Sequence, residues 1–161
     1  ACRQGYGWQQ RGHGLRIAVN LAASQLQSND FVSTVTSVLR ETRFLPALLE
    51  IEITEDILLG DGERLIEIFR EIQNLGVYVA FDDYGTGYAS LSYLKKFSFD
   101  TLKIDRSFVR ELREGSDDAA IVASTIDLSK LLGLAVVAEG IEDRATAYPL
   151  RKRGYGQGEG H

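Results

Sequence analysis

The sequence contains one cysteine, two prolines and no methionine among its 161 residues. A single cysteine, Cys2, excludes an internal disulfide and fits a reducing compartment. No stretch approaches the ~20 consecutive apolar residues that a membrane-spanning helix needs, and the first residues lack the apolar centre of a signal peptide. We therefore expect a cytoplasmic chain, and membrane attachment through a segment outside it stays open.

The charge balance also limits the class of partner. The formal net charge is −5, with 18 basic and 23 acidic residues. An acidic chain is a poor candidate for binding duplex nucleic acid, which needs a basic surface. A small anionic ligand remains compatible with this charge if metal ions offset the carboxylates. The content of 44% hydrophobic and 25% charged residues is ordinary for one globular domain.

The order of apolar patterns predicts an α/β fold. Short apolar runs rich in β-branched residues are typical of strands. They occupy residues 15–20, 48–54, 77–83, 100–105 and 134–140. Helical periodicity is found between them, at residues 31–44, 63–75 and 119–132. Because strands and helices alternate, we predict a parallel sheet built from about five βα units.

Each predicted strand finishes on a polar residue. These residues are Asn20, Glu52, Asp82, Lys103 and Glu139. Out of step with these polar residues, the strands carry pairs of apolar residues, so one face suits packing beneath helices. These pairs are Ile17 and Val19, Ile51 and Ile53, Val79 and Phe81, Leu102 and Ile104, and Val136 and Ala138. Because parallel strands end at a common edge, the polar side chains are predicted to meet there, which is where α/β folds place their sites.

The doubled carboxylate Asp82-Asp83 adds a second indication. One interpretation is that both side chains are separate and solvated, and the other is that they share a cation. Neighbouring carboxylates at a strand end can reach two metals ~3.5–4 Å apart. Oxygen ligands without histidine or cysteine favour Mg²⁺, Mn²⁺ or Ca²⁺ over zinc.

Four segments resemble the EAL domain family, bacterial phosphodiesterases that act on cyclic di-GMP. They are AVNLAASQL (18–26), LLEIEITED (48–56), FDDYGTGYASLSYLKKFSFDTLKIDRSFV (81–109) and VVAEGIED (136–143). The resemblance covers nearly the whole chain, and its long central motif is highly specific. It implies a partial (β/α)₈ TIM-like barrel of the EAL type and hydrolysis of cyclic di-GMP to linear pGpG with two Mg²⁺ or Mn²⁺ ions.

The resemblance also implies roles for individual residues. Asn20, Glu52 and Asp82 would bind the first metal. Asp82 would bridge to the second metal, which Asp83 and Glu139 would also hold. The resemblance further implies that Lys103 would orient the attacking water.

Three further implications concern the loop and the substrate. Glu55 would tether the loop 84–90. Tyr88 could stack on a guanine, and Gln157 would lie beside the substrate.

Structural alternatives stay open for several of these residues. Lys103 could be an ion-pair partner of a buried carboxylate, and Glu55 could interact only with a helix N-terminus. Asp105 and Arg106 could pair with each other, and Tyr88 could simply pack.

The sequence departs from the family at both ends. No Glu-Ala-Leu tripeptide occurs, although the family takes its name and one metal ligand from it. We therefore expect residues 1–161 to be a partial EAL domain without its early strands. At the other end, RGYGQGEGH (153–161) is expected to form no further strand or helix.

Three functions follow as hypotheses. The first is a metal-dependent cyclic di-GMP phosphodiesterase. The second is a catalytically inactive module that binds cyclic di-GMP or a protein partner, and the third is an unrelated Mg²⁺-dependent barrel enzyme. The resemblance further implies a homodimer and sensor or cyclase domains outside this chain.

Overall fold

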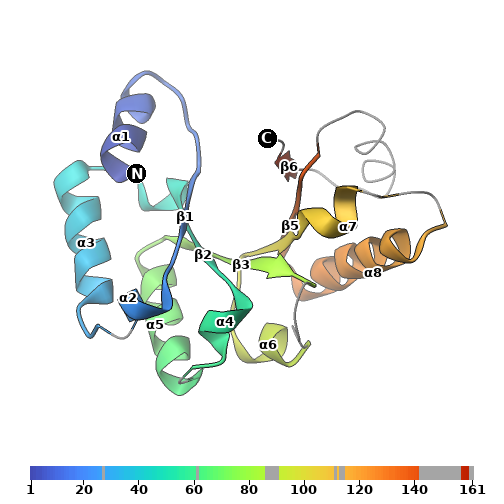
Figure 1. Cartoon of the computed structure of the whole chain (residues 1–161). Helices are drawn as coiled ribbons and strands as arrows, with labels where there is room; N and C mark the ends of the chain where they lie inside the picture. Colours follow the sequence, from blue (N-terminus) through green and yellow to red (C-terminus); the bar gives the residue numbers. More distant parts are fainter. Residues whose placement is uncertain are drawn as a thin grey trace. The chain divides into compact units, whose positions relative to one another are not determined.

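A computed structural model describes residues 1–26, 28–60, 62–85, 91–110, 112 and 115–141, together with the backbone of residues 157–159. The chain forms two compact units. Unit 1 comprises Ala1–Ala80 and Ser90–Phe99, and unit 2 comprises Phe81–Ala89 and Asp100–His161. Strand β3 (Tyr78–Tyr84) begins in unit 1 and ends in unit 2. Figure 1 shows the helices and strands of both units.

Unit 1 alternates helices with strands. Its elements are α1 (Cys2–Gln10), β1 (Ile17–Asn20), α2 (Ala23–Leu26), α3 (Phe31–Thr42), the 3-10 helix η1 (Pro46–Leu48), β2 (Leu49–Ile53), α4 (Glu55–Leu58), α5 (Gly62–Asn74), the start of β3, and α6 (Leu91–Lys96). Strands β1 and β2 are parallel, and Asn20 is the register partner of Glu52. Helix α3 contacts both α1 and α5. Unit 1 therefore has the βα order that the sequence predicts.

Unit 2 contains the end of β3 followed by β4 (Thr101–Ile104), α7 (Arg106–Arg110), α8 (Asp117–Leu132), β5 (Ala135–Glu139) and β6 (Gln157–Glu159). Strand β5 pairs in parallel with β4 and with β6. Helices α7 and α8 both contact β5. Their shared apolar core consists of Ile104, Val109, Val122, Ile126 and Ala138.

Both ends of helix α8 are fixed by capping residues. The Ser116 hydroxyl accepts a hydrogen bond from the Ala119 backbone N–H at 3.2 Å, which caps the first turn. At the other end Gly133 has a φ of +73°, the left-handed conformation that ends many helices. The chain then enters β5 directly.

The predicted faces of the strands are confirmed in the middle of the chain. Ile53, Phe81, Leu102 and Ile104 are at most 1% exposed, as expected for an apolar face beneath helices. The opposite face is also buried, because Glu52 is 4% exposed and Lys103 is 3% exposed. Burial on both faces is typical of parallel sheets.

One expectation about the C-terminal tail is wrong. The tail was expected to form no further strand, but residues Gln157–Glu159 form β6 beside β5. The physical reason is that β5 offers backbone hydrogen-bonding groups to a short extended segment whatever its side chains are. A glycine-rich run has little strand propensity of its own, so sequence alone does not reveal it.

Candidate metal centre

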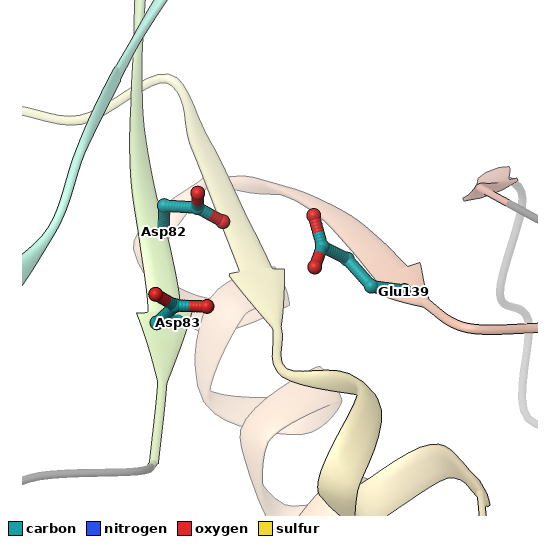
Figure 2. Close-up of side chains that lie close together, drawn as sticks. All are labelled: Asp82, Asp83 and Glu139. Carbon is teal, nitrogen blue, oxygen red and sulfur yellow. The ribbon is translucent and has the colours of Figure 1, made fainter. Parts of the chain in front are cut away.

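Three carboxylates gather in unit 2. Asp82 and Asp83 come from the end of β3 and Glu139 from the end of β5. Each offers an oxygen, and these oxygens all lie within 4.8 Å of one another. Figure 2 shows the carboxylates of Asp82 and Glu139 pointing toward each other from the two strands. The predicted meeting of strand-end carboxylates is thus observed for these three residues.

The donor set fits a hard divalent cation. Mg²⁺ binds oxygen at about 2.0–2.1 Å and Ca²⁺ at about 2.3–2.6 Å. Two ligands of one ion therefore lie at most about 4.2 Å or about 5 Å apart, respectively. The observed limit of 4.8 Å is within the range for calcium and needs only a small closure for the smaller ions. Carboxylate oxygens are also the ligands that these cations prefer.

The backbone of Asp83 explains how two successive residues reach one cluster. Side chains alternate between the two faces of a strand, so adjacent residues normally point apart. Asp83 has a φ of +56°, in the left-handed region that aspartate tolerates better than most residues. This conformation interrupts the alternation at the end of β3. The doubled aspartate therefore acts as a pair rather than as two opposed side chains.

Lys103 from β4 inserts its ammonium among these carboxylates. Its Nζ lies 2.6 Å from Oε1 of Glu139 and 3.7 Å from Oδ1 of Asp82. The first distance is a short charge-assisted hydrogen bond, and the second is an ion pair without hydrogen-bond length. The Lys103 side chain is 4% exposed, so its charge is balanced by protein groups rather than by water. The ion-pair alternative raised from the sequence is therefore observed as a contact, and the role of Lys103 in orienting water stays a prediction.

Burial and neighbouring charges shift the titration of Asp83. Burial raises the pKa of the Asp83 carboxyl, and the negative charges of Asp105 and Glu139 and a hydrogen bond with the Asp105 side chain raise it further. The positive charge of Lys103 opposes this shift. The Asp83 carboxyl therefore resists ionisation more than an ordinary aspartate does.

Asp105 lies next to the metal centre, although the sequence did not place Asp105 in the site. Burial alone would raise the pKa of Asp105, but hydrogen bonds from Ser107 and from the Arg106 backbone, with the Arg106 charge, lower it overall. The Ser107 backbone N–H donates to Oδ1 of Asp105 at 2.9 Å, so Asp105 caps the start of α7. Its place two residues after Lys103, at the end of β4, was the signal available in the sequence.

Two glycines bring the strand ends against helix α7. Gly85 follows β3 and has a φ of +104°, and a Cβ built there would lie 2.7 Å from Cε2 of Phe108. Gly140 follows β5 and has a φ of +73°, and its Cβ would lie 2.8 Å from Cβ of Arg106. Both distances are shorter than real side chains show, so only glycine fits at either position. Helix α7 thus supports the turns that follow Asp83 and Glu139.

Unit 1 holds the other predicted ligands. Asn20 and Glu52 are register partners on β1 and β2, so their backbones lie side by side at the strand ends. Asn20 is exposed and Glu52 is 4% exposed. That Asn20 and Glu52 share ions with the unit 2 carboxylates remains a prediction.

Glu55 begins helix α4 next to Asp56, where acidic side chains interact favourably with the helix dipole. Its Oε2 is buried and has no hydrogen-bond partner in the part of the chain that the structure describes. The proposed tether to loop 84–90 is untested, because residues 86–90 lie outside the described residues.

The two predicted substrate contacts also lie outside what the structure describes. Tyr88 falls in residues 86–90. For Gln157 only the backbone is described, as the first residue of β6 opposite Val137 on β5. Both assignments stay predictions.

Successive βα units with acidic residues and a lysine at the strand ends are typical of parallel α/β proteins, which place their functional sites at that edge. The sequence profile of the EAL domain matches residues 1–161, so the chain belongs to the EAL domain family. The predicted fold class, a partial (β/α)₈ TIM-like barrel of the EAL type, is confirmed by solved EAL structures that superpose on it.

Several relatives carry functional names. The chain is 41% identical over 155 residues to the bifunctional diguanylate cyclase/cyclic di-GMP phosphodiesterase MucR of Pseudomonas aeruginosa, covering 96% of this chain and 23% of MucR. It is 34% identical over 158 residues to the cyclic di-GMP phosphodiesterase PdeR of Escherichia coli, covering 98% of this chain and 24% of PdeR. The chain therefore spans about a quarter of the length of these relatives.

Solved structures cover almost all of the chain. The EAL domain of Mycobacterium smegmatis DcpA matches with a TM-score of 0.93 and 38% identity, over 99% of this chain and 73% of that one. The MucR phosphodiesterase in complex with cyclic di-GMP matches with a TM-score of 0.91 and 40% identity, over 99% of this chain and 65% of that one. A manganese and cyclic di-GMP complex of Klebsiella pneumoniae BlrP1 matches with a TM-score of 0.86 and 29% identity, over 97% and 40%.

Proposed function

We propose that this chain carries the metal-binding and catalytic groups of a cyclic di-GMP phosphodiesterase, which hydrolyses one phosphodiester bond of cyclic di-GMP to give linear pGpG. The observation that carries the proposal is the cluster of Asp82, Asp83 and Glu139 with Lys103 inserted among them. Membership of the EAL family and the functional names of MucR and PdeR support the choice of substrate.

Two Mg²⁺ or Mn²⁺ ions are the cofactors that we propose. Asp82, Asp83 and Glu139 would hold one ion, and Asn20, Glu52 and Asp82 would hold the other. When bound, such a pair of ions activates a water, neutralises the phosphate and stabilises the leaving oxygen. The manganese in the BlrP1 complex supports this class of ion.

The protein groups contribute position and charge. Lys103 is buried beside Glu139, so its ammonium can act on an anionic oxygen without competition from bulk water. Asp105 keeps its negative charge through the hydrogen bond from Ser107 and thereby acts on the neighbouring Asp83. Tyr88 and Gln157 remain our proposed contacts to the substrate.

The decisive experiment incubates the chain with cyclic di-GMP and Mn²⁺ or Mg²⁺ and quantifies pGpG by chromatography. We expect the substitution Asp82→Asn to lower kcat/KM by about 100-fold or more, since changes even outside the first ligand shell of a metal cost about 10–100-fold. Asp127→Asn is the matched control, because Asp127 is 72% exposed on α8 and pairs only loosely with Lys130 at 3.8 Å.

The outcomes separate the candidate functions. Metal-dependent formation of pGpG that Asp82→Asn abolishes supports the phosphodiesterase. Binding of cyclic di-GMP in Ca²⁺ without product in Mn²⁺ supports the inactive binding module instead. Absence of both binding and turnover in the wild-type chain contradicts the proposal.

The partners of the whole protein are also proposals. The name of MucR joins a cyclase with a phosphodiesterase, which supports additional domains on the natural protein. A homodimer remains our proposal on family resemblance. Within the described residues every helix is too short or too polar to cross a bilayer.

A further inference from the structure

Lys103 contacts two of the three carboxylates of the candidate metal centre. Its Nζ contacts Oε1 of Glu139 at 2.6 Å and lies 3.7 Å from Oδ1 of Asp82, and both carboxylates belong to the candidate centre. We propose that Lys103 and a divalent cation compete for the oxygens of Asp82 and Glu139, so that Lys103 sets how tightly the centre binds metal. This inference rests on the metal centre of the proposed function.

The distances place the two positive charges close together. A cation coordinated to Oε1 of Glu139 would lie about 2.1 Å from that oxygen. With Nζ 2.6 Å from the same oxygen, the two positive charges would be at most about 4.7 Å apart. Such a separation is well inside the Debye length of about 8–10 Å, so salt does not screen the repulsion. Each cation is therefore expected to weaken the binding of the other at this carboxylate.

Burial strengthens the effect. The side chain of Lys103 is 4% exposed and that of Asp82 is 10% exposed. Charges in such surroundings interact more strongly than charges in water. Little water reaches the ammonium, so its attraction to the carboxylates is only weakly reduced by solvation. A metal ion that coordinates the same oxygens must overcome this attraction.

The same contact offsets part of the repulsion among the three carboxylates. With all groups ionised, Asp82, Asp83 and Glu139 carry three negative charges and Lys103 reduces the total to two. Loss of the ammonium would remove a positive charge from beside carboxylates that lie within 4.8 Å of one another. Lys103 should therefore stabilise the fold when no metal is bound and weaken the binding of metal. A lysine with a purely structural role would have only the first effect.

The test uses Lys103→Met, which keeps the length of the side chain and removes its charge. Mn²⁺ binding is measured by calorimetric titration at fixed ionic strength and at a pH where the carboxyls are ionised. Thermal unfolding is followed in EDTA and in Mn²⁺. We expect Lys103→Met to bind Mn²⁺ about tenfold more tightly, within the 5–150-fold range of typical coupling between sites. It should also unfold at a lower temperature in EDTA.

Controls separate local competition from overall charge. Lys130→Met removes the same charge from an exposed position on α8, where Lys130 is 51% exposed, and should change the dissociation constant less than about twofold. Lys103→Arg keeps the charge and should bind Mn²⁺ within about threefold of wild type. If Lys103→Met does not fold, Lys103→Gln gives the same comparison with a polar side chain.

The outcomes are distinct. Tighter binding in the neutral variants, with lower metal-free stability and no change in Lys130→Met, supports the proposal. Equal or weaker Mn²⁺ binding in both Lys103→Met and Lys103→Gln overturns it while leaving the metal centre intact. Failure of the wild-type chain to bind Mn²⁺ overturns both the metal centre and the competition.

Discussion

Gly85 lies directly against the ring of Phe108. A side-chain carbon at residue 85 would sit 2.7 Å from Cε2 of Phe108, and the backbone φ of +104° is one that L-residues rarely adopt. Gly85 follows Asp83 by two residues, so this contact fixes the path of the chain as it leaves the candidate ligand. The packing of α7 and the geometry of the metal centre are therefore linked.

Gly85→Ala should lower the free energy of unfolding by about 1–3 kcal/mol, because a strained backbone and a clash are both introduced. It should also weaken Mn²⁺ binding by displacing Asp83. Gly115→Ala is the matched control, since Gly115 has a φ of +84° and no atom within 4 Å of a built Cβ. Chemical denaturation and calorimetric titration measure the two effects. Equal losses in the two variants would show that strain alone matters and that Phe108 does not position the turn.

Gly140→Ala offers a second comparison at the end of β5. Gly140 and Gly133 share a φ of +73°, but only Gly140 has a neighbour, Cβ of Arg106 at 2.8 Å. Gly133→Ala should lower the free energy of unfolding only through backbone strain and should leave the affinity for Mn²⁺ unchanged. Gly140→Ala should weaken Mn²⁺ binding by about tenfold or more through Glu139, on the scale of changes that misplace a metal ligand. Unchanged Mn²⁺ affinity in Gly140→Ala would contradict the idea that Arg106 supports this turn.

The raised pKa of Asp83 predicts a pH dependence of stability with a definite sign. Its folded-state pKa lies above the ordinary value of about 3.9, so the folded state binds the proton more readily than the unfolded state. The favourable contribution is fully present below the ordinary pKa and is lost as pH rises through the raised pKa. Asp83→Asn should remove this dependence, and asparagine tolerates the φ of +56° at this position.

The measurement is the difference in thermal midpoint between wild type and Asp83→Asn, in EDTA, across the acidic range. We expect Asp83→Asn to gain stability relative to wild type as pH rises from the ordinary pKa toward neutrality. Asp127→Asn, at a well-exposed carboxyl, is the control and should show no such trend. A constant difference between wild type and Asp83→Asn over this range would contradict the assignment.

The shared-site prediction can be tested with one residue from each unit. Glu52→Gln and Asp82→Asn should each abolish most of the hydrolysis of cyclic di-GMP, by about 100-fold or more. If both bind one ion, the double variant should be little worse than either single one, because residues that act together are strongly non-additive. Multiplicative losses in kcat/KM would place Glu52 and Asp82 in separate roles.

The sequence predicted the elements that depend on local pattern. The strands around residues 17–20, 49–53, 78–84, 101–104 and 135–139 follow from runs of β-branched residues, and the helix end at Gly133 follows from glycine. The meeting of Asp82, Asp83 and Glu139 also followed, since parallel strands end at one edge.

The features that the sequence did not reveal depend on contacts between distant residues. Neither the left-handed conformation of Asp83 nor the approach of Gly85 to Phe108 was evident from the sequence. The second depends on a residue of α7 that lies far from Gly85 along the chain. Pairing of Asp105 with Arg106 was one alternative from the sequence, and the Arg106 charge is among the causes that lower the pKa of Asp105. The sequence did not indicate that folding also brings Asp105 to Asp83. Strand β6 was missed because a glycine-rich run acquires its extended form only from pairing with β5.

The pairing of β6 with β5 has a practical consequence for work with this chain. Glu159 is the register partner of Glu139, so a segment attached shortly after β6 would begin close to the candidate ligand. A polyhistidine purification tag at that position would lie near Glu139. Its imidazoles would bind transition metals such as nickel, copper or zinc. Titrations of divalent ions will report on the native carboxylates only after such a tag has been cleaved or moved to the opposite terminus.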